Sequence, residues 1–147
     1  MRVTIQICLL SLTTSLRLFY KEPRDTTSVH NQLVVLMSYF KSEFYEPENW
    51  SYGKNCWLPL SGPSHGFPID PLDALCKSYK ECLKCALKQH GNHCAPGLIY
   101  QFEFDDGQVI CQDGADTCER LLCRCDAVFA EQTVAMNSNL RFPTCHN

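Results

Sequence analysis

The sequence predicts a mainly α-helical domain with a small β-hairpin, built from an N-terminal helix and two antiparallel helices that disulfides join. Three observations predict this fold class. Three segments have the apolar spacing of helices, one short stretch alternates like a strand pair, and ten of the eleven cysteines lie between Cys56 and Cys145. A length of 147 residues suits one domain.

The first predicted helix covers residues 31–40. Its apolar side chains have the spacing i, i+3, i+4, i+7 of a single helix face, and these are Leu33, Leu36, Met37 and Phe40. From residue 46 to residue 66 the composition changes to Pro, Gly, Ser and Asn, which predicts a long irregular loop. Loops of this length are usually functional or pinned, and Cys56 is placed to pin this one.

The second predicted helix covers residues 71–90, with Pro71 just inside its start and Gly91 at its end. One broad stripe on this helix is formed by Leu72, Leu75, Cys76, Tyr79, Cys82, Leu83 and Ala86. Residues 100–104 and 108–111 then predict a β-hairpin around the turn Asp106-Gly107.

The third predicted helix runs from about residue 115 to residue 134, and Asp113 or Asp116 is expected to cap its start. Its expected inward positions are Cys118, Leu121, Leu122, Cys125 and Phe129.

Ten clustered cysteines in a small chain indicate about five disulfides and an oxidising compartment. A cytosolic zinc protein is the alternative. The spacing disfavours it, because zinc-binding cysteines usually come as two short-spaced pairs accompanied by His.

The N-terminal residues 1–19 are interpreted as a signal peptide, with cleavage between Ser15 and Tyr20 and a domain over residues 20–147. The apolar stretch after Arg2 is too short to span a membrane, so a secreted, extracellular protein without a transmembrane segment is expected.

Asn49 begins an Asn-Trp-Ser glycosylation acceptor. The formal charge is −3, and removal of the signal peptide leaves 11 basic and 16 acidic residues, so no nucleic-acid partner is expected.

Four motifs in a fixed order resemble the secreted phospholipase A2 family, and the likeness covers nearly all of the mature chain. They are Tyr52-Gly53, Pro68-Ile69-Asp70-Pro71-Leu72-Asp73, LCKSYKEC over residues 75–82, and CERLLCRCD over residues 118–126. The resemblance implies the family's fold. It also implies ester hydrolysis, in which a histidine deprotonates water and calcium stabilises the oxyanion.

This sequence departs from the family at the reacting positions. Tyr79 stands at the position of the histidine, and Lys80 stands at the position of a calcium-ligating carboxylate. A phenol has a reference pKa near 10, and an ammonium repels a divalent cation. The loop between Cys56 and Gly66 is also longer than the family's calcium loop. An inactive site follows, so no cofactor is expected, and calcium is expected only if the chain is an enzyme.

Asp126 matches a family carboxylate that two tyrosines bind, and those tyrosines are expected to be replaced here by Leu83 and Phe102. An unpaired buried carboxylate is costly, so we expect the Tyr79 hydroxyl, the Lys80 ammonium or both to satisfy it. The alternative is that Asp126 faces solvent or caps local backbone.

The resemblance also implies the disulfide pairing. An alternative pairs Cys56 with Cys145 and leaves Cys76 for another partner. The implied pairs are Cys82–Cys125, Cys94–Cys118, Cys111–Cys123, Cys56–Cys76 and Cys85–Cys145.

Three further groups of residues are weighed as sites. His90 and His93 are interpreted as helix-terminal residues rather than as metal ligands. The acidic residues Glu103, Asp105, Asp106, Asp113 and Asp116 are interpreted as a solvated turn. For Trp50, Trp57, Leu58 and Leu60, an exposed contact surface and a loop folded over the cleft remain open.

The sequence therefore predicts an inactive phospholipase A2-like protein that acts as a binding or extracellular-matrix scaffold. The segments CERLLCRCD and NSNLRFPTC are similar to otoconin-type proteins, which belong to a mineral matrix. Its expected partner is an extracellular protein, a phospholipid or a mineral surface. The alternative is a calcium-dependent phospholipase A2 that hydrolyses the sn-2 ester of glycerophospholipids. Membrane disruption is disfavoured, because it depends on a basic surface and this chain is acidic.

Overall fold

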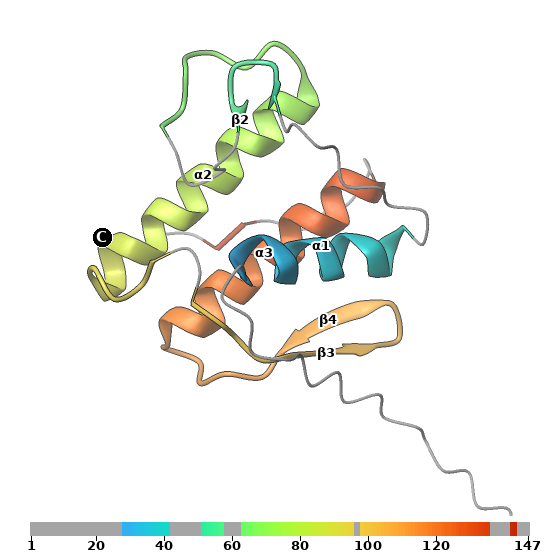
Figure 1. Ribbon diagram of the computed structural model, residues 1–147, viewed down its shortest axis with the longest axis vertical. Coiled ribbons are helices and arrows are strands. Elements are labelled where there is room, and N and C mark those ends of the chain that lie inside the picture. Colours follow the sequence, from blue (N-terminus) through green and yellow to red (C-terminus); the bar gives the residue numbers. More distant parts are fainter. Residues whose placement is uncertain (1–27, 42–50, 58–62, 96–97, 136–141, 144–147) are drawn as a thin grey trace, which may run out of the picture.

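A computed structural model describes residues 28–41, 51–57, 63–95, 98–135 and 142–143. The predicted signal peptide, Asn49, Trp50, Leu58, Leu60 and Cys145 lie outside these residues. Three helices and two small hairpins make up the described part, in the order α1, β1, β2, α2, β3, β4, α3 (Figure 1). This confirms the predicted fold class.

Helix α1 spans Ser28–Phe40 and packs against α3. The predicted apolar face is correct, because Leu33, Leu36 and Met37 are buried and Phe40 packs against the core. Gln32 is also buried, and its amide donates to the backbone oxygen of Tyr100 at 2.8 Å.

Helix α2 spans Pro71–His90, as the sequence predicts. The Asp70 side chain caps its start by accepting from the Asp73 backbone nitrogen at 2.8 Å. The backbone nitrogen of Gly91 donates to the oxygen of Leu87 at 2.9 Å and ends the helix.

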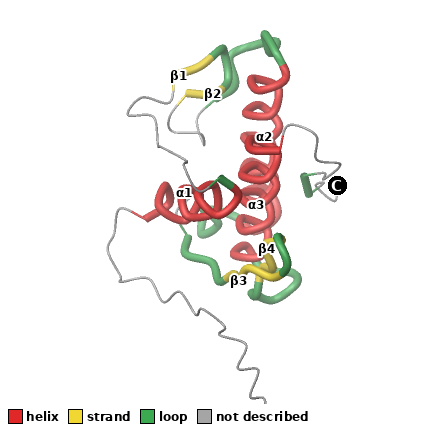
Figure 2. Tube along the Cα trace, turned by 90° about the vertical axis from the view of Figure 1, so that its right-hand side faces the viewer, coloured by secondary structure: helices red, strands yellow, loops and turns green. Residues whose placement is uncertain are grey.

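Helix α3 spans Cys118–Ala135 and runs antiparallel beside α2 (Figures 1 and 2). The expected caps Asp113 and Asp116 are wrong. Thr117 caps the helix, because its hydroxyl accepts from the Arg120 nitrogen at 3.2 Å. The Asp113 carboxylate instead accepts from the Gln101 nitrogen at 2.7 Å. Of the expected inward residues, four are buried and Leu121 is partly buried.

Strands β3 (Phe102–Asp105) and β4 (Gln108–Cys111) form the predicted hairpin, with Phe102 opposite Cys111. Asp106 and Gly107 both have positive φ, the conformation that a two-residue hairpin turn requires.

The second hairpin lies within the segment predicted as an irregular loop. Strands β1 (Ser51–Tyr52) and β2 (Cys56–Trp57) pair antiparallel, with Tyr52 opposite Cys56. Strands of two residues have no alternation that a sequence pattern can show. The β1–β2 hairpin lies beside the start of α2, and the β3–β4 hairpin lies at the other end of the molecule (Figure 2).

Four disulfides join these elements: Cys56–Cys76, Cys82–Cys125, Cys94–Cys118 and Cys111–Cys123. All four are pairs that the resemblance implies, and the alternative pairing of Cys56 with Cys145 is wrong. Cys85 is also disulfide-bonded. Its implied partner, Cys145, is outside the described residues.

Removal of the α2–α3 disulfide should destabilise the protein more than removal of the β4–α3 disulfide. Their sequence separations are 43 and 12 residues. Loop-closure entropy then gives about 4 kcal/mol for Cys82–Cys125 and about 3 kcal/mol for Cys111–Cys123. The measurement is guanidinium unfolding of the C82A/C125A and C111A/C123A double variants. Each variant truncates two buried cysteines, so the packing loss is matched. An equal or reversed order would contradict the entropic account.

Candidate functional site

The centre of the candidate site is a hydrogen bond between α2 and α3. The Tyr79 hydroxyl donates to Asp126 Oδ1 at 2.6 Å. Tyr79 precedes Cys82 by three residues and Asp126 follows Cys125, so the Cys82–Cys125 disulfide brings the two side chains together. Both are buried, and the Tyr79 ring packs on Phe129 with ring centres 4.5 Å apart. The expected pairing of Tyr79 with Asp126 is confirmed.

Asp126 has a second phenolic partner, which the sequence interpretation missed. The Tyr100 hydroxyl donates to Asp126 Oδ2 at 2.7 Å. The assignment of Phe102 to this position is therefore wrong. Phe102 is partly buried and packs between the rings of Tyr100 and Phe104. Leu83 is buried in the core, where it has no polar atom to offer. The alternative of a solvent-facing Asp126 is also wrong.

Burial dominates the electrostatics of this carboxylate. It raises the pKa of Asp126 to about 6, although the hydrogen bonds from Tyr79 and Tyr100 act to lower it. Burial also raises the pKa of Tyr79 well above its usual value, and the charge and hydrogen bond of Asp126 act in the same direction. Tyr79 is thus a proton donor that stays protonated at neutral pH.

This arrangement lacks the chemistry of a general base. A histidine can give one ring N–H to a carboxylate and accept a proton from water at its other nitrogen. Tyr79 has a single oxygen, and its proton is already donated to Asp126. The raised pKa also removes the phenolate that would be needed for proton abstraction.

Of the two partners expected for Asp126, the Tyr79 hydroxyl binds the carboxylate, whereas the Lys80 ammonium binds a backbone oxygen instead. The side chain is 1% exposed, and its Nζ donates to the backbone oxygen of Pro63 at 3.1 Å. Burial is the main cause that lowers the pKa of Lys80. The charge of Lys84 acts in the same direction, and the charge of Asp73 opposes both.

Asp73 holds the β1–β2 turn against α2. Its buried carboxylate accepts from the backbone nitrogens of Lys54 at 3.0 Å, Asn55 at 2.6 Å and Ile69 at 3.1 Å. The Asn55 side chain also donates to it at 3.1 Å. Burial acts to raise the pKa of Asp73, but these hydrogen bonds together lower it below the usual value. Gly53 is required beside it, because a Cβ there would lie 2.6 Å from the carboxylate.

These residues do not fit a calcium ion. Calcium binds six to eight oxygen ligands, including carboxylates. The position expected to supply a carboxylate carries the Lys80 ammonium, and all of the Asp73 hydrogen bonds come from the protein itself. Across the described ranges, no group of three or more His, Cys, Asp or Glu side chains is placed to hold a metal.

The other predicted candidates form no site. His93 and the acidic residues Glu103, Asp105 and Asp106 are exposed, and no metal-binding group includes them within the described residues. Trp57 is 49% exposed. This exposure agrees with a contact surface at Trp57, and the other three residues of that prediction lie outside the described ranges.

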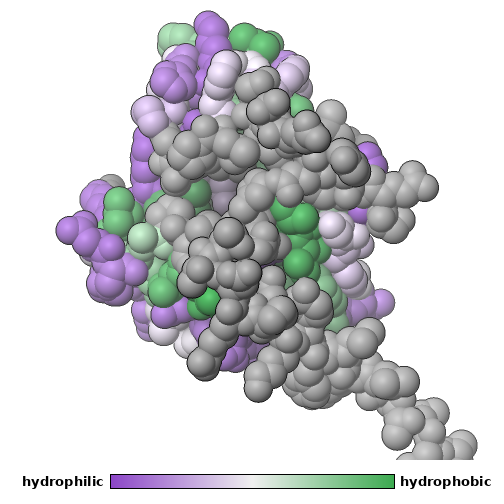
Figure 3. Space-filling view, in the orientation of Figure 1, coloured by the Kyte–Doolittle hydropathy of each residue, from purple (hydrophilic) through white to green (hydrophobic). Residues whose placement is uncertain are grey.

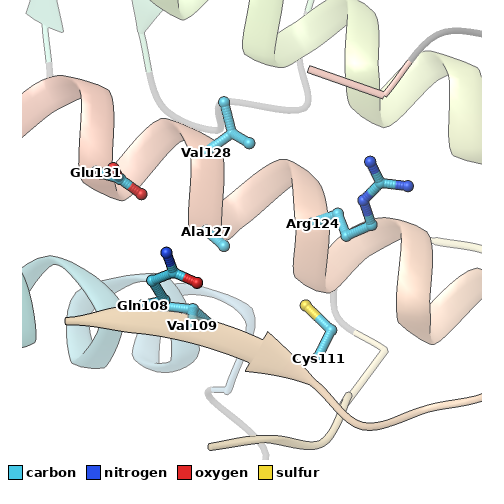
Figure 4. A pocket seen from close by; sticks show the side chains of 7 residues that line it. All are labelled: Gln108, Val109, Cys111, Arg124, Ala127, Val128 and Glu131. Carbon is cyan, nitrogen blue, oxygen red and sulfur yellow. The ribbon is translucent and has the colours of Figure 1, made fainter. Parts of the chain in front are cut away.

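A groove of about 250 Å³ lies between β4 and α3 (Figure 4). None of its lining residues belongs to the Tyr79 or Lys80 environment. They are Gln108, Val109, Cys111, Arg124, Ala127, Val128 and Glu131.

A comparison with known protein families identifies the fold. The family described as Phospholipase A2 matches residues 32–141. The chain belongs to the phospholipase A2 family. No helix in the described ranges is both long and apolar enough to cross a membrane.

Several snake proteins are similar to this phospholipase A2 family member. An acidic phospholipase A2 of Micrurus dumerilii is 38% identical over 80 residues, which cover 54% of this chain and 63% of the relative. The basic phospholipase A2 beta-bungarotoxin A-AL3 chain of Bungarus multicinctus is 36% identical over 84 residues, or 56% of each chain. The acidic phospholipase A2 homolog taipoxin gamma chain of Oxyuranus scutellatus scutellatus is 34% identical over 85 residues, which cover 51% of this chain and 49% of the relative. The chain thus spans less than two thirds of the length of these relatives.

Two signals in the sequence point to the residues that were missed. Tyr100 is the one hydroxyl-bearing aromatic residue in the run Tyr-Gln-Phe-Glu-Phe, so it alone there can donate to a carboxylate. Asp73 lies three residues before Cys76 on the helix, on the side that the cysteine buries.

The Asp126→Asn variant should remove one component of the pH dependence of stability. The folded-state pKa of about 6 lies above the unfolded value of 3.8, so the folded protein binds the Asp126 proton more tightly. The contribution of Asp126 to stability is therefore highest below the unfolded pKa and decreases until the pH exceeds the folded pKa. This difference corresponds to about 3 kcal/mol.

The measurement is denaturant unfolding of wild type and D126N at a series of pH values. Wild type should lose about 3 kcal/mol relative to D126N between about pH 4 and pH 6.5. The exposed Asp116 provides the control, since D116N should follow wild type. Parallel curves for wild type and D126N would show that the buried carboxylate titrates normally.

Proposed function

We propose that this chain is a secreted phospholipase A2 family member that does not hydrolyse phospholipid and acts as an extracellular binding scaffold. The observation that supports this most directly is the hydrogen bond from Tyr79 to Asp126, because Tyr79 is the residue that the sequence resemblance aligns with the family's base. Function depends on the site rather than on the fold. Two relatives, the taipoxin gamma chain and the textilotoxin D chain of Pseudonaja textilis, are also named phospholipase A2 homologs.

Secretion is supported by the disulfides, which persist in oxidising compartments. The otoconin-like segments CERLLCRCD and NSNLRFPTC suggest a matrix form of this role on a mineral surface. The exposed acidic hairpin residues Glu103, Asp105 and Asp106 agree with such a role but form no dense acidic field.

A phospholipid surface is the partner that the described side chains favour. Near the start of α2 four large apolar side chains are exposed, and we call them the apolar end: Tyr52 (43%), Trp57 (49%), Phe67 (87%) and Ile69 (58%). Hydrophobic and hydrophilic surface lie side by side over this region, at the top of Figure 3. Aromatic residues of this kind prefer the interface between lipid and water.

The polar atoms of the apolar end are already bound within the protein. The Tyr52 hydroxyl donates to Asp70, and Trp57 Nε1 donates to the Gly53 oxygen at 2.8 Å. The rings are therefore left to contact a partner. The Lys77 ammonium lies 5.8 Å from the centre of the Phe67 ring and adds a cation at the margin.

Wild type should release no more fatty acid from phosphatidylcholine vesicles than Tyr79→Phe, with or without calcium. The phenylalanine variant keeps the ring and removes the hydroxyl, so it defines the background. Calcium titration calorimetry should give no heat of binding. Calcium-dependent hydrolysis by wild type above the Y79F level would instead support the enzyme alternative.

The F67S/I69S double variant should bind phosphatidylcholine vesicles at least tenfold more weakly than wild type, because two large apolar contacts are lost. Vesicle sedimentation measures the binding. Leu87→Ser is the matched control, since Leu87 is 41% exposed near the other end of α2. Equal weakening in L87S, or no weakening in F67S/I69S, would rule out the apolar end as the lipid-binding surface. Calcite particles and immobilised extracellular proteins serve as competing surfaces in the same assay.

A further inference from the structure

Lys80 combines a positive charge with almost complete burial. At 1% exposure, it is the largest fully buried side chain among the described residues. Its Nζ donates to the Pro63 oxygen, a neutral acceptor, at 3.1 Å. Within the described residues it forms no ion pair. A buried charge without a counter-charge costs several kcal/mol.

Hydrogen-bonding capacity remains at this point of the structure. An ammonium has three N–H donors, and the Pro63 oxygen uses one of them. The next residue, Ser64, carries a buried hydroxyl that has no partner in the described part of the chain. Pro63 and Ser64 share a peptide unit, so the serine side chain starts beside the carbonyl that Lys80 contacts. The Lys80 ammonium contacts the residue that precedes Ser64, and each of the two side chains has a donor for which the described residues supply no acceptor.

The charged neighbours leave this region positive. Lys84 lies one turn further along α2 and adds to the positive potential at Lys80. Asp73 opposes it, but the Asp73 carboxylate already accepts four hydrogen bonds from Lys54, Asn55 and Ile69. The missing group is therefore a negatively charged acceptor rather than a cation.

We propose that Lys80 and Ser64 bind a small monovalent anion, a halide or a carboxylate, where the phospholipase A2 family holds calcium. Such an anion neutralises the buried ammonium and accepts from the N–H and O–H groups that lack partners. Two sources share this chemistry, free chloride and a carboxylate group. The inference rests on the proposed function, because a site that binds calcium for hydrolysis would exclude an anion.

The test is the linewidth of the ³⁵Cl NMR signal of sodium chloride in the presence of the full-length protein. Wild type should broaden the signal. Lys80→Met should abolish the broadening, and Ser64→Ala should weaken chloride binding severalfold. Lys88→Met is the matched control, because it removes an exposed charge from the same helix and should retain broadening. Lys80→Gln serves as a second variant if K80M does not fold.

Competition identifies the source of the anion. Reversal of the broadening by acetate assigns a carboxylate, and reversal by bromide alone assigns a halide. No broadening by folded wild type, or unchanged broadening in K80M, overturns the site. Hydrolysis measured on the same preparations separates the two proposals. An inactive protein without broadening contradicts only the anion site, whereas an active one contradicts the proposed function.

Discussion

The register between α2 and α3 is the constraint on which the site depends. The Cys82–Cys125 bond fixes this register. Tyr79 lies one helical turn before Cys82 and Asp126 directly follows Cys125, so their side chains meet. Tyr100 arrives just before the β3–β4 hairpin and occupies the second oxygen of the same carboxylate. Helix α1 packs on α3, so Met37 joins Phe129 in the core that the α2–α3 pair supports. The scaffold thus depends on the disulfide that aligns the two helices and on the buried carboxylate between them.

Two buried carboxylates show how the number of donors decides ionisation. Asp73 accepts four hydrogen bonds, and its pKa falls despite complete burial. Asp126 accepts two, and burial prevails and raises its pKa. Asp73 therefore acts as a permanent negative charge in the framework, whereas Asp126 changes charge state near physiological pH. The same residue type has two different roles within one helix pair.

The sequence predicted the elements that carry a periodic pattern and missed those that depend on contacts between distant residues. The bounds of α2 follow from Pro71, Gly91 and the apolar stripe. Phe102 was mistaken for the partner of Asp126 because residues two apart on a strand share one face, so the pattern does not distinguish it from Tyr100. The burial of Lys80 depends on the carbonyl of Pro63, which no local rule places beside α2.

The anchoring of the β1–β2 turn by Asp73 has a consequence for the environments in which the protein keeps its shape. In a loop organised by a bound ion, the conformation depends on the concentration of that ion. Here the anchor is part of the polypeptide, and Gly53 and Asn55 are fitted to it. We therefore expect chelators, or fluids of low ionised calcium, to leave the turn and its neighbour Trp57 in place.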